Sequence, residues 1–380
     1  MKVYFDNAAT TPLDPEVFEV MRPLMLENFG NPSSIHSHGR TVRSLIEISR
    51  KRVADLLKTS PAELFFTSGG TEADNTALRC AVEGLGVQRI ITSKIEHHAV
   101  LHTTEYLHKV HGVEAVFLNT DSKGNVDLDQ LKDILAAGGP KTLVSLMHAN
   151  NEIGNMIDLM EVGTIAHEYG ALFHSDTVQT MGHFTHDLSV LPVDFLVGSA
   201  HKFHGPKGVG FLYINHKNKI PPFIHGGAQE RNMRGGTENV YGIVGLAKAL
   251  EIAYRDMEGH KNHILGLKKQ MIEGLKANLP DVNFNGMSGD LDKSLYTVLN
   301  VCTAPSDNNE MLLFNLDING ISISGGSACS SGSNVGSHVL AELDRDPKRG
   351  AIRFSFSRYN TSEEVSFAVS KLAEIAAVHA

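Results

Sequence analysis

Residues 193–208 read VDFLVGSAHKFHGPKG, and this stretch decides the fold. Its apolar run, residues 195–197, is of the kind expected for a fully buried strand. A second apolar run, residues 209–214, follows the glycine- and proline-rich turn at once, so Lys202 sits in a tight connection between two buried elements. Two interpretations stay open: a surface lysine at a loop tip, where most lysines lie, or a desolvated amine that can form a Schiff base.

Strands and helices alternate on the amino-terminal side of this stretch. Short apolar runs that predict strands are separated by segments with helical periodicity. These runs are residues 64–67, 90–92, 116–118, 143–147 and 172–176. The alternation predicts an α/β fold with a mostly parallel central sheet that helices cover on both faces.

The pattern changes on the carboxyl-terminal side. Residues 226–237 form a long polar loop rich in glycine, and residues 240–279 form a long helical stretch. We interpret this helical stretch as a connection between two domains, because the predicted strands beyond it alternate more openly between apolar and polar residues. We therefore expect a large domain of residues 13–258 and a smaller α+β domain of residues 1–12 and 259–380.

Length, charge and cysteine content exclude several classes of protein. The 380 residues are more than one core usually serves, and the net charge of -9 argues against a nucleic-acid surface. No run approaches the roughly 18 apolar residues that a membrane span needs, and the amino terminus lacks the pattern of a signal peptide. Three cysteines, Cys80, Cys302 and Cys329, cannot make a disulfide framework. We therefore expect a reducing, cytoplasmic location and no membrane partner.

A possible phosphate site lies between a predicted strand and a helix start, at residues 68–72, SGGTE. Unpaired backbone N–H groups at a helix start, together with the helix dipole, suit a phosphate. The loop is neither a Walker A motif nor a dinucleotide fingerprint. A plain helix cap with Thr71 or Ser68 as the N-cap residue is an equally open interpretation.

Other polar residues follow neighbouring predicted strands. Asp176 ends one strand, Gln179 lies three residues further on, and His97 follows another strand. Asp176 is either a helix cap or a carboxylate that pairs with a cationic ring nitrogen, and His97 is either structural or able to stack on an aromatic ring. Lys202, the phosphate loop at Thr71, Asp176 and His97 together describe a pyridoxal 5'-phosphate site.

Cys329 differs from the other two cysteines. It lies in residues 324–333, SGGSACSSGS, where glycine and serine offer little to bury a thiol and much backbone freedom. We interpret Cys329 as a mobile, accessible nucleophile. Cys80, in an apolar helix, and Cys302, in a strand, fit the usual pattern of small buried residues.

Two further patterns are less decisive. Arg353 alternates with apolar neighbours on a predicted strand, and it is either an exposed arginine or a bidentate partner for a carboxylate. The histidine pairs 183/186 and 201/204 have spacings that could bind metal. Neither pair has nearby Cys, Asp or Glu ligands that would close a site, so we expect no metal.

Taken together, the motifs resemble the cysteine desulfurases of the NifS/IscS type, pyridoxal-phosphate enzymes with the aspartate-aminotransferase-like fold (fold type I). The resemblance covers nearly the whole chain. The motifs that carry it are residues 5–11 (FDNAATT), 67–72 (TSGGTE), 96–100 (EHHAV), 150–154 (NNEIG), 199–202 (SAHK), 234–237 (RGGT) and 326–329 (GSAC).

The resemblance implies a set of cofactor contacts. Lys202 would form the aldimine and later shuttle a proton, Asp176 would pair with the pyridine nitrogen, Gln179 would bond the ring hydroxyl, and His97 would stack on the ring. The residues that would hold the phosphate are Gly70, Thr71, Ser199, His201 and, across a homodimer, Thr237 of the other subunit.

The resemblance also implies the reaction and its partners. Asn151 and Arg353 would bind the carboxylate of L-cysteine, with Asn151 also near the ring hydroxyl, and Cys329 would take the sulfur as a persulfide. The products would be L-alanine and a sulfur carried on the loop of residues 324–337 to a scaffold or sulfur-acceptor protein, as in iron–sulfur cluster assembly. The chain stops soon after its last predicted helix, where some members carry a longer tail that docks a scaffold protein.

Alternatives within the same fold are a selenocysteine lyase or another pyridoxal-phosphate lyase or aminotransferase. An aminotransferase would not need Cys329. A binding protein that kept the fold without its chemistry would not need Lys202 together with Asp176.

Overall fold

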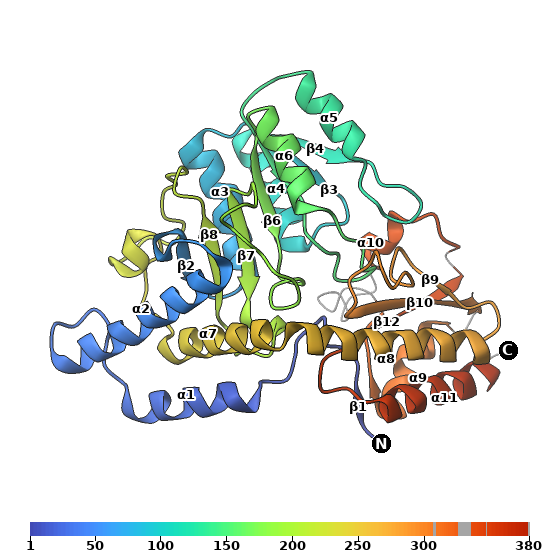
Figure 1. Ribbon diagram of the computed structural model, residues 1–380. Helices are drawn as coiled ribbons and strands as arrows, with labels where there is room; N and C mark the ends of the chain where they lie inside the picture. The colour runs from blue at the N-terminus through green and yellow to red at the C-terminus, as the bar shows by residue number, and fades with distance from the viewer. Residues whose placement is uncertain (307–308, 326–335, 347, 379–380) are drawn as a thin grey trace.

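The computed structural model describes residues 1–306, 309–325, 336–346 and 348–378 (Figure 1). Its largest feature is a seven-stranded sheet in the order β2-β8-β7-β6-β5-β3-β4. The strands are β2 (Leu64–Thr67), β3 (Arg89–Ser93), β4 (Glu114–Leu118), β5 (Thr142–Ser145), β6 (Leu172–Asp176), β7 (Phe195–Ser199) and β8 (Gly210–Ile214).

The sheet is mostly parallel, as predicted, with β8 as the exception. β8 pairs antiparallel with both β2 and β7, because only a short connection joins it to β7 and a parallel crossover needs a dozen or more residues. Helices supply the crossovers between consecutive strands from β2 to β6 and cover the sheet, whereas residues 177–194, between β6 and β7, contain no helix. The crossover helices are α3 (Gly70–Leu85), α4 (His98–His111), α5 (Leu128–Ala136) and α6 (Leu159–Glu168).

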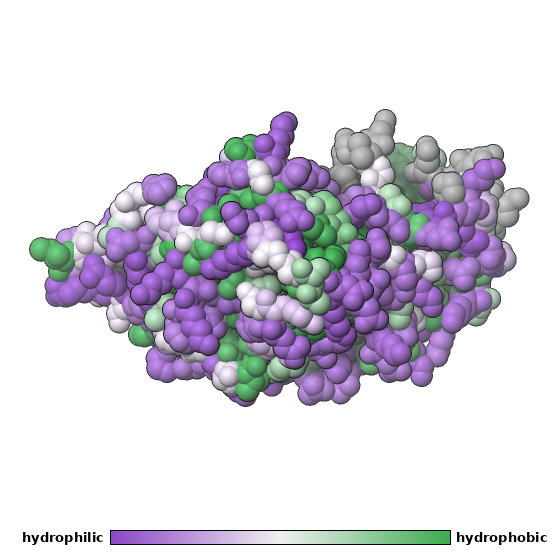
Figure 2. All heavy atoms as spheres, turned by 90° about the horizontal axis from the view of Figure 1, so that it is seen from above, coloured by the Kyte–Doolittle hydropathy of each residue, from purple (hydrophilic) through white to green (hydrophobic). Residues whose placement is uncertain are grey.

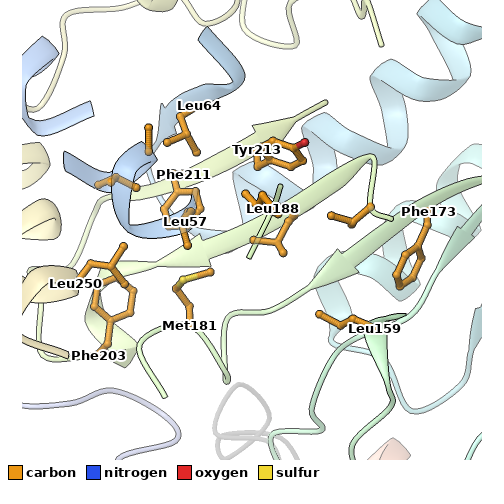
Figure 3. Close-up of a cluster of buried hydrophobic side chains, with 14 of the residues drawn as sticks. Leu57, Leu64, Leu159, Phe173, Met181, Leu188, Phe203, Phe211, Tyr213 and Leu250 are labelled. Carbon is orange, nitrogen blue, oxygen red and sulfur yellow. The ribbon is translucent and has the colours of Figure 1, made fainter. Parts of the chain in front are cut away.

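Both faces of this sheet are buried, which explains the continuous apolar runs in its strands. In β7, Leu196 points into a core that also holds Leu57 and Phe211 (Figure 3). Its neighbours Phe195 and Val197 point to the opposite face, into a core shared with α3 and α4. The first core is covered by three further helices, α1 (Pro15–Glu27), α2 (Ser37–Leu57) and α7 (Val240–Arg255).

The predicted helical stretch of residues 240–279 is two helices. α7 ends at Arg255, and α8 (Met257–Asn278) begins after Asp256, whose φ of -114° is not helical. Figure 1 shows α7 and α8 running almost end to end from the seven-stranded sheet to the rest of the molecule. The interpretation as a connection therefore fits the observed path of the chain.

Two small sheets lie beside α8. β10 (Val298–Pro305) pairs antiparallel with β9 (Asn283–Phe284) and β12 (Arg349–Ser355), and β1 (Val3–Tyr4) pairs parallel with β11 (Ile321–Ser322). Three helices complete this part: α9 (Leu312–Ile318), α10 (His338–Ala341) and α11 (Ser362–Val378). The first residues of the chain thus join the carboxyl-terminal part, and the proposed domain boundaries stay a prediction.

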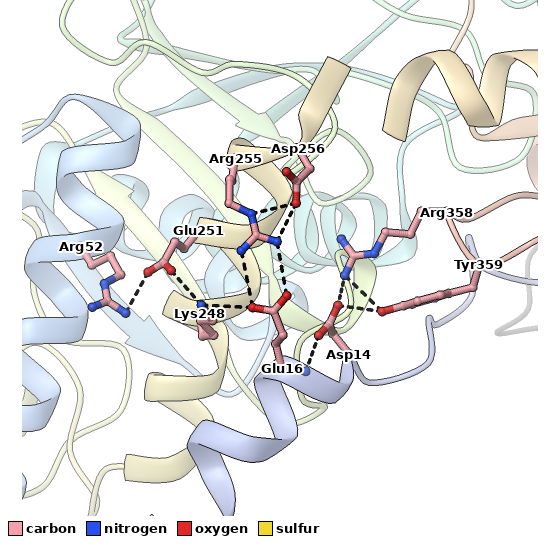
Figure 4. Close-up of polar contacts among 9 residues, drawn as sticks. All are labelled: Asp14, Glu16, Arg52, Lys248, Glu251, Arg255, Asp256, Arg358 and Tyr359. Carbon is pink, nitrogen blue, oxygen red and sulfur yellow. Dashed lines mark hydrogen bonds and ion pairs between the residues drawn. The ribbon is translucent and has the colours of Figure 1, made fainter. Parts of the chain in front are cut away.

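A polar cluster ties α1 to α7 and to the carboxyl-terminal part (Figure 4). Asp14 caps α1 through its Oδ1, and its Oδ2 accepts a hydrogen bond from Tyr359 at 2.7 Å and pairs with Arg358. Two residues after Asp14, Glu16 pairs with Arg255 of α7 at 3.3 Å. The start of α1 is therefore tied both to the end of α7 and to the segment between β12 and α11. Across the described ranges, no helix is long and apolar enough to cross a membrane.

Candidate active site

A cleft lies at the carboxyl ends of the parallel strands, where ligands bind in open α/β sheets. The cleft has a volume of about 220 Å³ and is partly open to solvent. Most of the side chains singled out from the sequence line this one cleft. They are Gly70, Thr71, His97, Asn151, Asp176, Gln179, Ser199, His201, Lys202 and Arg353.

Lys202 is half-buried in this cleft. It ends the short 3-10 turn of Ala200–Lys202 that follows β7, so the buried strand fixes where its side chain starts. Its Nζ donates hydrogen bonds to the backbone carbonyls of Ala8 at 2.5 Å and Ala9 at 3.0 Å. The amine thus faces the cleft against an N-terminal segment far away in the sequence.

The start of α3 forms one end of the cleft. The N-cap residue is Gly69, which has no side chain to cap the helix, so the alternative with Thr71 or Ser68 as N-cap is wrong. The first-turn N–H groups of α3 therefore face the cleft without a capping side chain, which suits an anion. A Cβ on Gly70 would lie 2.8 Å from Val178 Cγ2, so only glycine lets α3 approach this closely.

A second hollow extends this end of the cleft. Gly70, Thr71, Ser199 and His201 border both the cleft and the hollow, and the exposed Lys207 borders the hollow alone. Burial lowers the pKa of His201 to about 4, with the charges of Lys202 and Lys207 adding to the effect. Neutral His201 and cationic Lys207 surround a space suited to a phosphate group. Lys207 is a residue that the sequence reasoning did not single out.

Asp176 lines the same cleft from the end of β6. It is 6% exposed, and its Oδ1 accepts a hydrogen bond from the backbone N–H of Val178 at 2.9 Å. A turn follows Asp176, so the alternative that it caps a helix is wrong. Burial raises the pKa of Asp176, while His97 and Lys202 act in the opposite direction.

His97 stands beside Asp176 and caps a helix. It is the N-cap of α4, because its Nδ1 accepts the backbone N–H of Ala99 at 3.1 Å. The proton therefore sits on Nε2 of the neutral ring. Burial lowers the pKa of His97, and Asp176 acts against that effect.

Arg353 is 1% exposed and reaches the cleft from β12, so the exposed-arginine alternative is wrong. Asp6 pairs with its Nη2 at 2.8 Å, and the carbonyl of Asn151 accepts from its Nη1 at 2.9 Å. Its buried Nε has no hydrogen-bond partner among the described residues. Gln179 donates from Nε2 to the carbonyl of Ala8 at 3.1 Å.

The cleft contains polar residues that sequence reasoning missed. Asp74, Glu152, His98 and His338 all line it. Glu152 is fully buried and accepts a hydrogen bond from Ser337 Oγ at 2.5 Å. Two features of the sequence could have indicated these acids. Glu152 lies in the motif of residues 150–154, and Asp74 lies one helical turn after Gly70.

Several predicted residues lie outside the cleft. Thr237 is exposed and does not line it, and Cys329 lies outside the described residues. Cys80 and Cys302 are buried, as predicted. The histidine pairs have partners within the protein: His183 contacts Tyr296, His186 contacts Thr180, His201 contacts Thr10 and His204 contacts the carbonyl of Pro12.

The fold and the cleft can be compared with those of known protein families. The sequence profile of the aminotransferase class-V family matches residues 3–367, and the chain belongs to this family. Among its relatives, the cysteine desulfurase IscS of Dictyoglomus turgidum is 44% identical over 378 residues, which are 98% of this chain and 94% of the relative. The cysteine desulfurase IscS of Methanosarcina thermophila is 45% identical over 378 residues, 98% of this chain and 91% of the relative.

Solved structures agree with the family. A structure described as a NifS-like protein is 38% identical, with a TM-score of 0.90 over 100% of both chains. The cysteine desulfurase from Thermococcus onnurineus NA1 is 28% identical, with a TM-score of 0.86 over 98% of this chain and 94% of that one. The predicted family and the predicted aspartate-aminotransferase-like fold are confirmed.

Proposed function

We propose that the chain is a cysteine desulfurase that uses pyridoxal 5'-phosphate and converts L-cysteine to L-alanine. The observation that carries this proposal is the convergence of Lys202, Asp176, His97 and the uncapped start of α3 on one cleft. These groups come from separate strand ends, so their meeting is a property of the fold. Relatives that match almost the whole chain are named cysteine desulfurases.

The residues fit the cofactor. The phosphate needs donors, and the start of α3 with Ser199 and His201 supplies them. The aldehyde needs a lysine, and Lys202 lines the same cleft. The ring nitrogen needs a buried carboxylate, which Asp176 provides, while the neutral ring of His97 suits stacking. When bound, the cofactor's protonated ring supplies an electron sink for a carbanion at the substrate's α-carbon.

The same arrangement suits an amino-acid substrate. Arg353 has a buried Nε without a partner in the described residues, and its guanidinium can take a carboxylate bidentately. Asn151, whose carbonyl holds Arg353 in place, borders the cleft beside it. Lys202 Nζ, once released by the substrate amine, is the group that moves the α-proton in this proposal.

Cys329 completes the reaction as the sulfur acceptor. Its thiolate attacks the sulfur of the bound substrate, the bond between that sulfur and the substrate's Cβ breaks, and Cβ gains a proton. L-cysteine and an acceptor thiol thus give L-alanine and a persulfide, with no outside oxidant or reductant. A sulfur-acceptor or scaffold protein then receives the sulfur, and a cytoplasmic location stays a prediction from the cysteine content.

A homodimer with shared active sites is part of the proposal. Thr237 is exposed and away from its own cleft. Large apolar side chains on and between α1 and α2 are exposed to solvent, among them Leu26 (74%), Phe29 (78%) and Ile35 (88%). Figure 2 shows apolar atoms at the tip of the molecule where this segment lies. Such a cluster favours a protein interface.

The test uses the purified full-length chain. We expect a visible absorbance that borohydride reduces, and L-cysteine with a thiol reductant should give L-alanine and sulfide in equal amounts. A colourless protein that makes no alanine would overturn the proposal. Turnover of L-selenocysteine with none of L-cysteine would favour the selenocysteine lyase, and a keto-acid product would favour the aminotransferase.

A further inference from the structure

Asp74 is a buried carboxyl group that the reaction proposed above does not use. It projects from the first turns of α3 into the base of the cleft and is 1% exposed. One oxygen of Asp74, one oxygen of Asp176 and one ring nitrogen of His97 all lie within 4.8 Å of one another. Its Oδ1 has no hydrogen-bond partner among the described residues.

A line of buried neutral groups continues behind Asp74. His174 Nε2 lies 3.3 Å from Asp74 Oδ1, and His174 Nδ1 lies 2.8 Å from Ser145 Oγ. All three side chains are almost completely buried. Burial lowers the pKa of His174 to about 3, so this ring is neutral and its Nε2 can accept a proton donor. His174 and Asp176 share one face of β6 because they are two residues apart.

Two carboxyl groups this close in a buried site cannot both be ionised, because each negative charge disfavours the other. The surroundings decide which one keeps the proton. Asp176 receives the N–H of Val178 and faces Lys202 and His97, and these contacts favour its ionised form. Burial raises the pKa of Asp74 well above its usual value, and the nearby acids Asp176 and Glu96 add to this effect.

We propose that Asp74 is a positioning residue for Asp176: it holds the proton that the two carboxyl groups share, so that Asp176 alone is the carboxylate that meets the cofactor ring. The hydroxyl of Asp74 donates towards His174 Nε2, and His174 Nδ1–H donates to Ser145. The inference rests on the proposed function for the cofactor ring, but the protonation of Asp74 does not depend on it.

The first test follows the stability of the cofactor-loaded full chain against pH. A carboxyl group that is protonated in the fold and ionised when unfolded lowers stability as pH rises from its unfolded pKa to its folded pKa, by about tenfold in the unfolding constant per pH unit. Asp74→Asn removes this loss, so its thermal midpoint should exceed that of the wild type by a margin that grows with pH. The exposed Asp133→Asn should show no such margin.

The second test detects the proton directly. Infrared spectra of the cofactor-loaded protein with ¹³C-labelled aspartate carboxyls should show a protonated aspartate band near neutral pH. The band should persist in Asp176→Asn and vanish in Asp74→Asn. A wild-type spectrum without the band, or a band lost only in Asp176→Asn, would overturn the inference. Both results can be obtained even if Asp74→Asn does not fold.

A third measurement separates positioning from simple packing. Because Asn is neutral like the protonated Asp74, Asp74→Asn should keep the cofactor affinity near neutral pH, whereas Asp176→Asn should lose on the order of tenfold or more. At alkaline pH the wild type should lose affinity as Asp74 ionises, and Asp74→Asn should not. The inference would be overturned if the cofactor affinities of the wild type and of Asp74→Asn changed with pH in the same way. A protein that binds no cofactor at all would instead refute the proposed function, and the same infrared comparison on the cofactor-free protein would then decide the state of Asp74.

Discussion

Lys202 has a position that makes its substitution informative at the scale of a single residue. Its Nζ lies against the carbonyls of Ala8 and Ala9, and its side chain is only partly buried, so Lys202→Ala should fold. We expect the variant to lose the absorbance that borohydride reduces, and its turnover should fall by at least about a hundredfold because the proton-moving group is gone. The exposed Lys217→Ala, outside the cleft, is the matched control and should keep the lysine linkage. A reducible linkage in Lys202→Ala would identify another lysine.

Single residues were predictable from sequence where the fold brings strand ends together. Lys202, Asp176 and His97 each follow a strand of one parallel sheet, and the carboxyl ends of such strands meet at one edge. Asp74 and Glu152 were missed because an acid in a helix or a loop is normally exposed. Their burial depends on partners distant in sequence, His174 for Asp74 and Ser337 for Glu152.

At the scale of elements, the start of α3 depends on Gly70. A Cβ there would meet Val178 Cγ2 at 2.8 Å, and Val178 sits beside Asp176 on the rim of the cleft. Gly70→Ala should therefore push α3 and the rim apart and weaken cofactor binding by roughly tenfold or more. The control is Gly266→Ala on α8, where an added Cβ meets nothing within 4 Å. Equal cofactor affinity in Gly70→Ala and the wild type would show that this contact does not matter.

The boundary between α7 and α8 shows what sequence patterns miss at this scale. Asp256 separates the two helices although neither glycine nor proline marks the place, so the apolar periodicity predicts one helix. At the break, Arg255 pairs with Asp256 at 2.7 Å and with Glu16 of α1 (Figure 4), and these side-chain contacts are not visible in the apolar periodicity.

At the scale of the whole molecule, Asp14 links α1 to the carboxyl-terminal part. Burial alone would raise the pKa of Asp14, but the hydrogen bond from Tyr359 and the charge of Arg358 outweigh it and lower the pKa. A lowered pKa stabilises the fold above the ordinary pKa of an aspartate, and this contribution disappears as pH falls through the folded value. Asp14→Asn, which still caps α1, should therefore lower the thermal midpoint at pH 7, and the difference should shrink as pH falls.

The control for this pH dependence is Asp133→Asn, on the exposed side of α5, which should track the wild type throughout. If Asp14→Asn lost the same stability from pH 7 down to strongly acidic pH, the contribution of Asp14 would come from packing and not from its charge.

The proposed homodimer also belongs to this scale. Phe29, between α1 and α2, is 78% exposed, and Val190, elsewhere on the surface, is 63% exposed. Phe29→Asp should shift the protein towards monomers in sedimentation and reduce turnover, because each site would lose Thr237 of the other subunit, whereas Val190→Asp should do neither. A fully active monomer would contradict shared active sites. The sequence could indicate this only through resemblance, because a single chain does not show which exposed surface a second copy covers.

The most direct test of the account is peptide mass spectrometry of the wild-type protein after L-cysteine is added without reductant. A cysteine desulfurase of the proposed kind leaves one extra sulfur on the peptide that contains Cys329, and none on those that contain Cys80 or Cys302, whose thiols are buried. Cys329→Ser should bind L-cysteine and change the cofactor absorbance but form no persulfide and little alanine. Extra sulfur on another cysteine, or alanine made at the normal rate by Cys329→Ser, would contradict the account.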